Sequence, residues 1–93
     1  MYAVIFKAEI NEFDQQYFDM VEKLRQLAKD EYDCVDIISA TEGTNEITIS
    51  YWNTMDDIKK WKQDEVHQLA QRLGKEKWYT SYKVQIVEIL REY

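Results

Sequence analysis

The residues best suited to chemistry lie in WKQDEVHQLAQRLGKEKWYTSY, residues 61–82, which contains the only histidine of the chain. His67 stands between Trp61 and Trp78, two of the three tryptophans. An imidazole titrates near neutral pH, so it is suited to accept and return a proton during a reaction. Flat aromatic side chains suit a pocket for a flat aromatic ligand, although in small domains they also serve as core and interface residues. The stretch therefore indicates a candidate site for proton transfer on an aromatic molecule.

The direction in which His67 points depends on the helix that carries it. In one straight helix over Thr54–Leu73, His67 lies roughly 140° from the centre of the buried stripe and faces water. That stripe consists of Ile58, Val66, Leu69 and Leu73. Asp64, however, is a good residue to cap a new helix, and a break at Gln63-Asp64 would give the second segment a phase of its own. A solvated histidine and a pocket histidine are both open at this point.

Metal and phosphate chemistry find little support in the sequence. One cysteine and one histidine cannot supply the three or four ligands of a typical zinc or iron site. Cys34 stands among Val35, Ile37 and Ile38, which predicts a buried, unreactive thiol. The chain has no glycine-rich phosphate loop and no serine nucleophile elbow. We expect neither a metal nor a cofactor.

The elements that must position the site begin with a strand and a helix. Tyr2–Glu9 is rich in apolar and aromatic residues and predicts the first strand, after which Asn11 or Asp14 offers a side-chain oxygen to cap a helix. The helix repeats apolar residues at the spacing of one buried stripe. These residues are Phe13, Tyr17, Met20, Val21, Leu24, Leu27 and Ala28.

The second half of the chain predicts a hairpin, a helical segment and a last strand. The runs CVDIISATEG and TNEITISYW are joined by Glu42–Asn45, which has the Gly and Asn that tight turns need. Asn53-Thr54 then begins helical sequence that continues to Leu73, and Gly74 is suited to end it in a left-handed conformation. Tyr79–Glu92 predicts a long final strand.

This order, β-α-β-β-α-β, predicts one domain over residues 1–93 with the ferredoxin-like α+β fold, in which helices cover one face of an antiparallel sheet. The other face remains open. The chain is 45% hydrophobic and 14% aromatic, more than a domain of 93 residues can bury alone. A symmetric homodimer that covers the open face is therefore expected.

Charge and hydropathy exclude other classes of partner. The net charge of −6 would repel a phosphate backbone, so nucleic acid is not expected. No segment approaches the roughly 20 apolar residues that a bilayer span needs, and MYAVIFKAEI is typical of a strand rather than a signal peptide. We expect no membrane partner and a cytoplasmic location.

Three stretches together resemble the small single-domain proteins of the antibiotic biosynthesis monooxygenase family. They are AVIFKAEI, EYDCVDIISATEGTNEITISYW and WKQDEVHQLAQRLGKEKWYTSYKVQIVEILREY, which cover nearly the whole chain. The most specific part is the pattern of Trp61, His67, Ala70, Gln71, Gly74, Trp78 and Tyr79. The resemblance implies a ferredoxin-like subunit that pairs into a dimeric α+β barrel.

The branches of this family differ in what they imply for activity. In the haem-degrading branch an axial histidine follows a pocket tryptophan, and that position falls at Gln71, so the resemblance does not imply haem degradation. That branch also has a first-strand asparagine, whereas Asn11 follows the strand here. In the polyketide-oxidising branch, oxygen reacts with a deprotonated aromatic substrate without metal or flavin.

The chain departs from the usual family pattern at Asp33, which replaces a glycine before Cys34. Aspartate tolerates the left-handed backbone that such a turn needs.

Two functional hypotheses follow. In the first, the chain is a cofactor-independent monooxygenase-like enzyme for a small phenolic or quinol-type compound, with His67 and Gln71 taking or orienting the phenolic proton. The substrate ring would be held by Trp61, Trp78, Tyr82 and Trp52. In the second, the chain is a non-catalytic dimeric module, either a stress-related protein or one that binds a small aromatic or apolar ligand. An isomerase of the same fold cannot be separated from the first. A packed space around Trp61 would favour the module, and a cavity of a few hundred Å³ with convergent polar groups would favour the enzyme.

Overall fold

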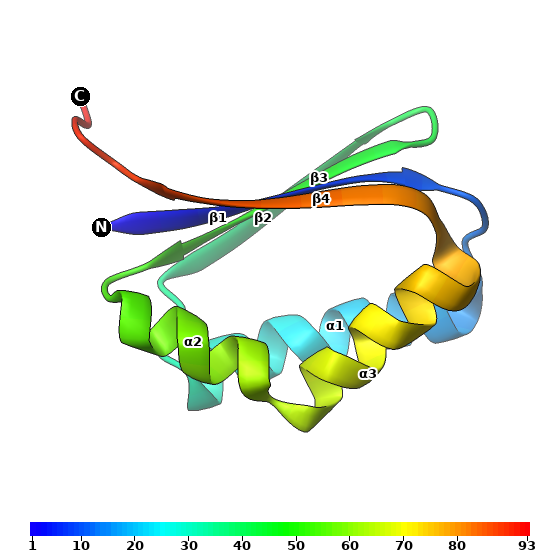
Figure 1. The fold of residues 1–93 in the computed structure, drawn as a ribbon, viewed down its shortest axis with the longest axis horizontal. Helices are drawn as coiled ribbons and strands as arrows, with labels where there is room; N and C mark the ends of the chain where they lie inside the picture. The colour runs from blue at the N-terminus through cyan, green and yellow to red at the C-terminus, as the bar shows by residue number, and fades with distance from the viewer.

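The computed structural model describes residues 1–93 as two layers, a four-stranded antiparallel sheet with helices over one face (Figure 1). The sheet order is β2-β3-β1-β4, so the first and third strands occupy the centre. This arrangement confirms the expected ferredoxin-like α+β fold. The elements are β1 (Tyr2–Ile10), α1 (Gln15–Glu31), β2 (Asp36–Glu42), β3 (Asn45–Trp52), α2 (Met55–Gln63), α3 (Glu65–Leu73), a π-helical turn (Gly74–Trp78) and β4 (Tyr79–Glu88).

Local signals account for most element ends. The side chain of Asp14 accepts a hydrogen bond from the Tyr17 amide at 2.7 Å, so Asp14 is the cap of α1. The β2–β3 hairpin turns at Gly43, whose φ of 59° is readily available to glycine. Asp33 also adopts a φ of 59°, which confirms that aspartate accepts the left-handed conformation before Cys34. Cys34 is buried, and this burial raises the pKa of its thiol.

The helical segment is broken at Asp64, the second of the two alternatives left open by the sequence. α2 ends at Gln63, and Asp64 itself has extended backbone with φ −60° and ψ 136°. Its Oδ1 accepts hydrogen bonds from the amides of Val66 at 2.8 Å and His67 at 3.2 Å, which begins α3 as a separate helix. The two helices therefore differ in phase, and the straight-helix geometry does not apply to His67.

Two expected element ends were wrong. Gly74 is not left-handed: its φ of −59° and ψ of −48° carry the helix on into the π-helical turn. Glycine is needed there because an added Cβ would lie 2.5 Å from Cε2 of Tyr79. The last strand ends at Glu88 rather than at Glu92. Glu88 pairs with Tyr2, the first residue of β1, and the Ile89 amide still donates to the Met1 carbonyl at 3.0 Å. Residues after Ile89 pair with no strand.

The two faces of the sheet differ in their surroundings. All three helices lie on the same side of the sheet in Figure 1, and the opposite side is uncovered. Successive side chains of a strand point to opposite faces of the sheet. Strand residues that alternate with those lining the space under the helices therefore lie on the open face. Open-face apolar residues are Ile5, Ile38, Ile47, Ile49, Tyr51 and Val87. No helix combines the length and apolar character that a transmembrane span requires.

The main core cluster lies beneath α2 and the C-terminal end of α1. It consists of Ala28, Cys34, Trp52 and Ile58, against which Tyr32 and Trp61 pack. This cluster fixes one end of the helical layer on the sheet.

Candidate functional site

A cavity of about 510 Å³ lies between the sheet and the helices. Its lining comes from all four strands and all three helices, and 13 of its 22 lining residues are hydrophobic. The remaining lining residues place hydroxyl, carboxylate, amide, imidazole and cationic groups in the same space. A largely apolar pocket with a few convergent polar groups is typical of a small-molecule site.

His67 lies on the wall of this cavity and stacks on Trp61. The ring centroids are 4.5 Å apart and the planes differ by 13°. Burial lowers the pKa of His67, although the nearby Trp61 carbonyl and Asp64 carboxylate act in the opposite direction. Its Nδ1 is buried and has no hydrogen-bond partner. The arrangement favours a neutral imidazole that can accept a proton.

Asp64 and Tyr32 hold this part of the wall in place. The Tyr32 hydroxyl donates to Oδ2 of Asp64 at 2.6 Å, while Oδ1 caps α3 next to His67. The Tyr32 ring also packs against Trp61, with centroids 5.4 Å apart. The hydrogen bond from Tyr32 is the main reason that the pKa of Asp64 lies below its usual range. One carboxylate thus links the end of α1 to the start of α3.

The structure brings four of the six predicted site residues together around the cavity. Trp61, His67, Gln71 and Tyr82 all line it. Tyr82 contributes from β4, and its ring lies near Phe6 of β1 with centroids 6.0 Å apart.

Trp52 and Trp78 do not line the cavity, so neither is placed to hold a substrate ring. Their side chains are 0% and 2% exposed, and both are packed into the core. The indole Nε1 of Trp52 donates to the Ser50 hydroxyl at 2.9 Å, and Trp52 supports Trp61 from below with centroids 6.3 Å apart. Trp78 meets the Tyr17 ring edge to face at 5.3 Å. Both tryptophans shape the site indirectly.

Sequence reasoning missed a second polar group at the cavity, formed by Tyr17, Glu46 and Tyr79. Glu46 is only 7% exposed, and the Tyr17 hydroxyl donates to its Oε2. Burial, assisted by Glu46, raises the pKa of Tyr79 to about 12 and also raises the pKa of Tyr17. The available signal was the alternation of β3, which puts Glu46 in phase with Thr48 and Ser50 on one polar face.

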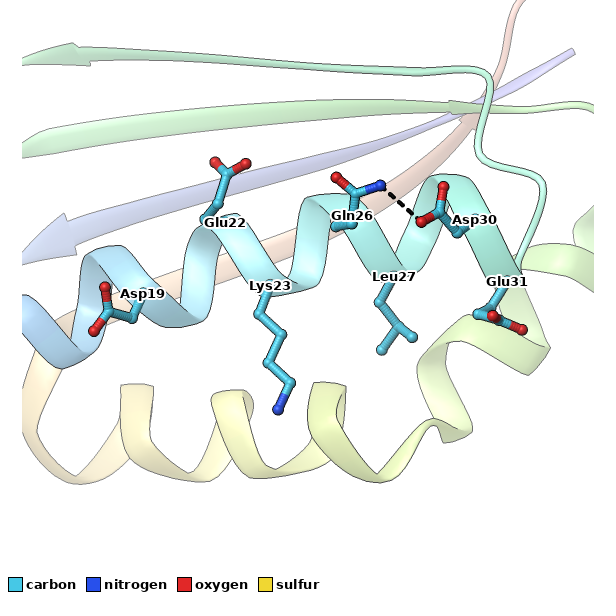
Figure 2. Close-up of a pocket in the computed structure, with 7 residues that line it drawn as sticks. All are labelled: Asp19, Glu22, Lys23, Gln26, Leu27, Asp30 and Glu31. Carbon is cyan, nitrogen blue, oxygen red and sulfur yellow. Dashed lines mark hydrogen bonds between the residues drawn. The ribbon is translucent and has the colours of Figure 1, made fainter.

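A shallow groove on the outer surface of α1 has a different character. Figure 2 shows its lining side chains, all of which come from this one helix. Only Leu27 is hydrophobic, and Gln26 donates to Asp30 at 2.7 Å. The other residues are Asp19, Glu22, Lys23 and Glu31. This groove is a solvated helix surface, and no group of three or more His, Cys, Asp or Glu residues is placed to hold a metal ion.

Comparisons with known proteins identify one relative in sequence and several in fold. No family model matches the chain. The chain is 36% identical over 92 residues to the uncharacterised protein YqjZ of Bacillus subtilis, a match that covers 98% of this chain and 81% of YqjZ.

Solved structures share the fold at low sequence identity. SnoaB, a cofactor-independent oxygenase from Streptomyces nogalater, superposes with a TM-score of 0.82 at 5% identity, covering 98% of this chain and 94% of SnoaB. A candidate antibiotic biosynthesis monooxygenase from Nitrosomonas europaea gives 0.77 at 16% identity, covering 98% and 100%. A conserved protein from Methanosarcina mazei gives 0.80 at 14% identity, covering 92% and 89%. The chain therefore belongs to the same family as Bacillus subtilis YqjZ, and its fold is that of the antibiotic biosynthesis monooxygenases.

Proposed function

We propose that this protein is a cofactor-independent monooxygenase that oxidises a small phenolic or quinol-type compound in the cavity under α2 and α3. The observation that supports it most is His67, a partly buried imidazole with a lowered pKa on the wall of a largely apolar cavity of about 510 Å³. The likeness to SnoaB agrees with the proposal at the level of the fold. A cavity of this size also fits the enzyme better than a module packed tightly around Trp61.

Each proposed group has a role set by its position. The imidazole of His67 accepts the phenolic proton, and Gln71, one turn further along α3, orients the phenolic oxygen. Trp61 and Tyr82 hold the substrate ring from the helix side and the sheet side. Lys62 and Lys75 also line the cavity, and their positive charges favour the phenolate over the phenol. Trp52 and Trp78 are left out because they contact the core.

The proposed reaction needs no external reductant. The phenolate formed by His67 transfers an electron to molecular oxygen, and the two radicals recombine to form a carbon–oxygen bond on the ring. Cleavage of the oxygen–oxygen bond leaves one oxygen atom as a new carbonyl of the quinone product, and the other departs as water. All electrons that reduce the oxygen come from the substrate. The protein supplies a base, a largely apolar site and a fixed geometry.

We propose that the working unit is a homodimer formed through the open face of the sheet. Ile38 and Ile47 on this face are 49% and 41% exposed, and together with Ile5, Ile49 and Val87 they form an apolar surface over all four strands. Such a surface is larger than single scattered apolar residues and is best covered by an identical copy. The family resemblance implies the same pairing.

The experiment is a screen of electron-rich phenols and hydroquinones in air-saturated buffer that contains a metal chelator, followed by oxygen uptake and quinone absorbance. His67→Ala should lower turnover by roughly 10²–10⁴-fold, because it removes the proton acceptor. Gln68→Ala, an exposed neighbour on the same helix, is the matched control and should keep full turnover. Turnover unchanged in His67→Ala would remove the histidine from the mechanism. Turnover abolished by the chelator would show that the reaction needs a metal ion and would refute a cofactor-independent mechanism.

A further inference from the structure

Glu46 is a buried carboxylate with one of its oxygens unused by the protein. The Tyr17 hydroxyl is the only side-chain group that donates to it, and the bond goes to Oε2. No lysine or arginine forms an ion pair with it. Arg25, which lines the same cavity, donates instead to the Ser39 hydroxyl at 2.6 Å. Glu46 lines the cavity, and its Oε1 is therefore left without a protein partner.

A carboxylate in this position is costly for the fold alone. Burying a charged group among apolar residues is unfavourable unless hydrogen bonds or opposite charges compensate it. One tyrosine hydroxyl satisfies only part of the accepting capacity of a carboxylate. Thr48 and Ser50, on the same face of β3, show that small neutral residues fit this surface. The free oxygen is thus suited to accept a hydrogen bond from a ligand.

Glu46 lies toward the opposite end of the cavity from Trp61. In the β1–β3 ladder, Glu46 pairs with Ala8 and Trp52 pairs with Tyr2. The backbones of Glu46 and Trp52 are therefore separated by roughly 20 Å along β3. Trp61, which stacks on His67, packs at the Trp52 end. α1 shows the same separation, because Tyr17 near its start contacts Glu46 while Tyr32 at its end contacts Trp61. A ligand that reaches both polar groups must be elongated.

We propose that Glu46 accepts a hydrogen bond from a second hydroxyl group of the ligand, on the side of the aromatic system away from His67. The cavity thus selects an elongated aromatic diol over a compound with one hydroxyl. A neutral hydroxyl fits better than an ammonium group, because Arg25, Lys62 and Lys75 already give the lining positive charge. The place of the first hydroxyl rests on the proposed function of His67. The role of Glu46 does not.

Anaerobic calorimetry measures this selection without any turnover. The probes are para,para-dihydroxybiphenyl and its monomethyl ether, and a shorter pair made of a naphthalene diol with hydroxyls on opposite rings and its monomethyl ether. The native protein should bind at least one diol roughly 10- to 100-fold more tightly than its ether, as expected for a hydrogen bond to a buried charged acceptor. Equal affinity within both pairs would overturn the proposal.

Variants assign the selection to Glu46. The double variant Tyr17→Phe/Glu46→Leu replaces both hydrogen-bond partners by apolar groups of similar shape, so it should fold and lose the preference for the diol. Glu46→Gln should reduce the preference, since a neutral acceptor is weaker. Glu9→Gln, at an exposed carboxylate of β1 that does not line the cavity, is the matched control and should keep it. A preference that persists in the double variant would overturn the role of Glu46.

The outcomes for the two sites can be told apart. Turnover that needs His67 without any preference for a diol would refute the role of Glu46 and leave the proposed function standing. A diol preference that needs Glu46, in a protein whose turnover does not depend on His67, would support the role of Glu46 and refute the proposed role of His67.

Discussion

The two faces of β3 carry chemistry opposite to what their surroundings would normally select. On β3, Glu46, Thr48 and Ser50 face the helices, whereas Ile47 and Ile49 face the uncovered side. A sheet that served only as half of a core would place its apolar residues under the helices and its polar residues in water. The difference indicates that β3 supplies polar groups to a largely apolar cavity. The exposed isoleucines on its other face are the reason that we propose a dimer.

The largest effect is expected from a charge placed on the open face. Ile47→Asp should convert the proposed dimer into a monomer, because a carboxylate in an apolar interface between two copies would be buried without a partner. Sedimentation equilibrium at micromolar concentration should give about twice the 11.3 kDa chain mass for the native protein and a single chain mass for the variant.

The matched control for this change is Phe18→Asp, at an exposed apolar residue on α1, away from the open face. It should leave the mass unchanged. A native protein that sediments as a monomer would contradict the dimer and remove the reason for an apolar open face.

A smaller effect is expected at Gly74, which adjoins the covered face. Gly74→Ala would place Cβ 2.5 Å from Cε2 and 2.7 Å from Cδ2 of Tyr79, whose ring lines the cavity. The ring must move, and the free energy of unfolding should fall by about 1–3 kcal/mol. Ligand binding should weaken as well.

Gly43→Ala separates these two effects. It strains a backbone with φ 59° but meets no atom within 4 Å, so urea denaturation should show a loss of stability while calorimetry shows unchanged ligand affinity. Equal affinity losses in both variants would mean that Tyr79 is not a specific part of the cavity wall.

Asp64→Ala tests whether the helix break at Asp64 is what places His67 on the cavity wall. Loss of this cap should cost about 1 kcal/mol of stability and weaken the break between α2 and α3. Thr54→Ala removes the cap of α2 and should cost a similar amount without affecting the break. If α2 and α3 then join, His67 moves toward water and its pKa rises toward 6.5 in the Asp64 variant alone. If the break persists, loss of the nearby carboxylate lowers that pKa further.

The fold was predictable because its signals are local. The apolar stripe of α1, the Glu42–Asn45 turn and the alternation of the strands each depend on neighbours in sequence. The end of β4 was not, since it depends on where β1 begins. Gly74 was misassigned for a similar reason: the contact that requires glycine comes from a ring that packs back onto the helix.

The site was only partly predictable. Four of the predicted residues, Trp61, His67, Gln71 and Tyr82, line the cavity. Nothing in the sequence distinguishes Trp61 at the cavity from Trp52 in the core, because both are large and aromatic. The alternation of β3 was visible, but which of its faces lies under the helices is a tertiary property. Glu46 was therefore missed, although the sequence shows that it alternates in phase with the polar residues Thr48 and Ser50.

Proton NMR of the histidine ring tests the central claim most directly. The chain contains one histidine, so its ring signals can be followed without overlap between pH 4 and 9. The account predicts a pKa for His67 below 6.5 in the native protein, because burial disfavours the charged ring, and a shift of these signals when para,para-dihydroxybiphenyl is added. The unfolded chain then binds more protons than the native one, so the free energy of unfolding should fall as the pH is lowered below 6.5. A pKa of 6.5 or higher, with ring signals that do not respond to the ligand, would place His67 in water and contradict the account.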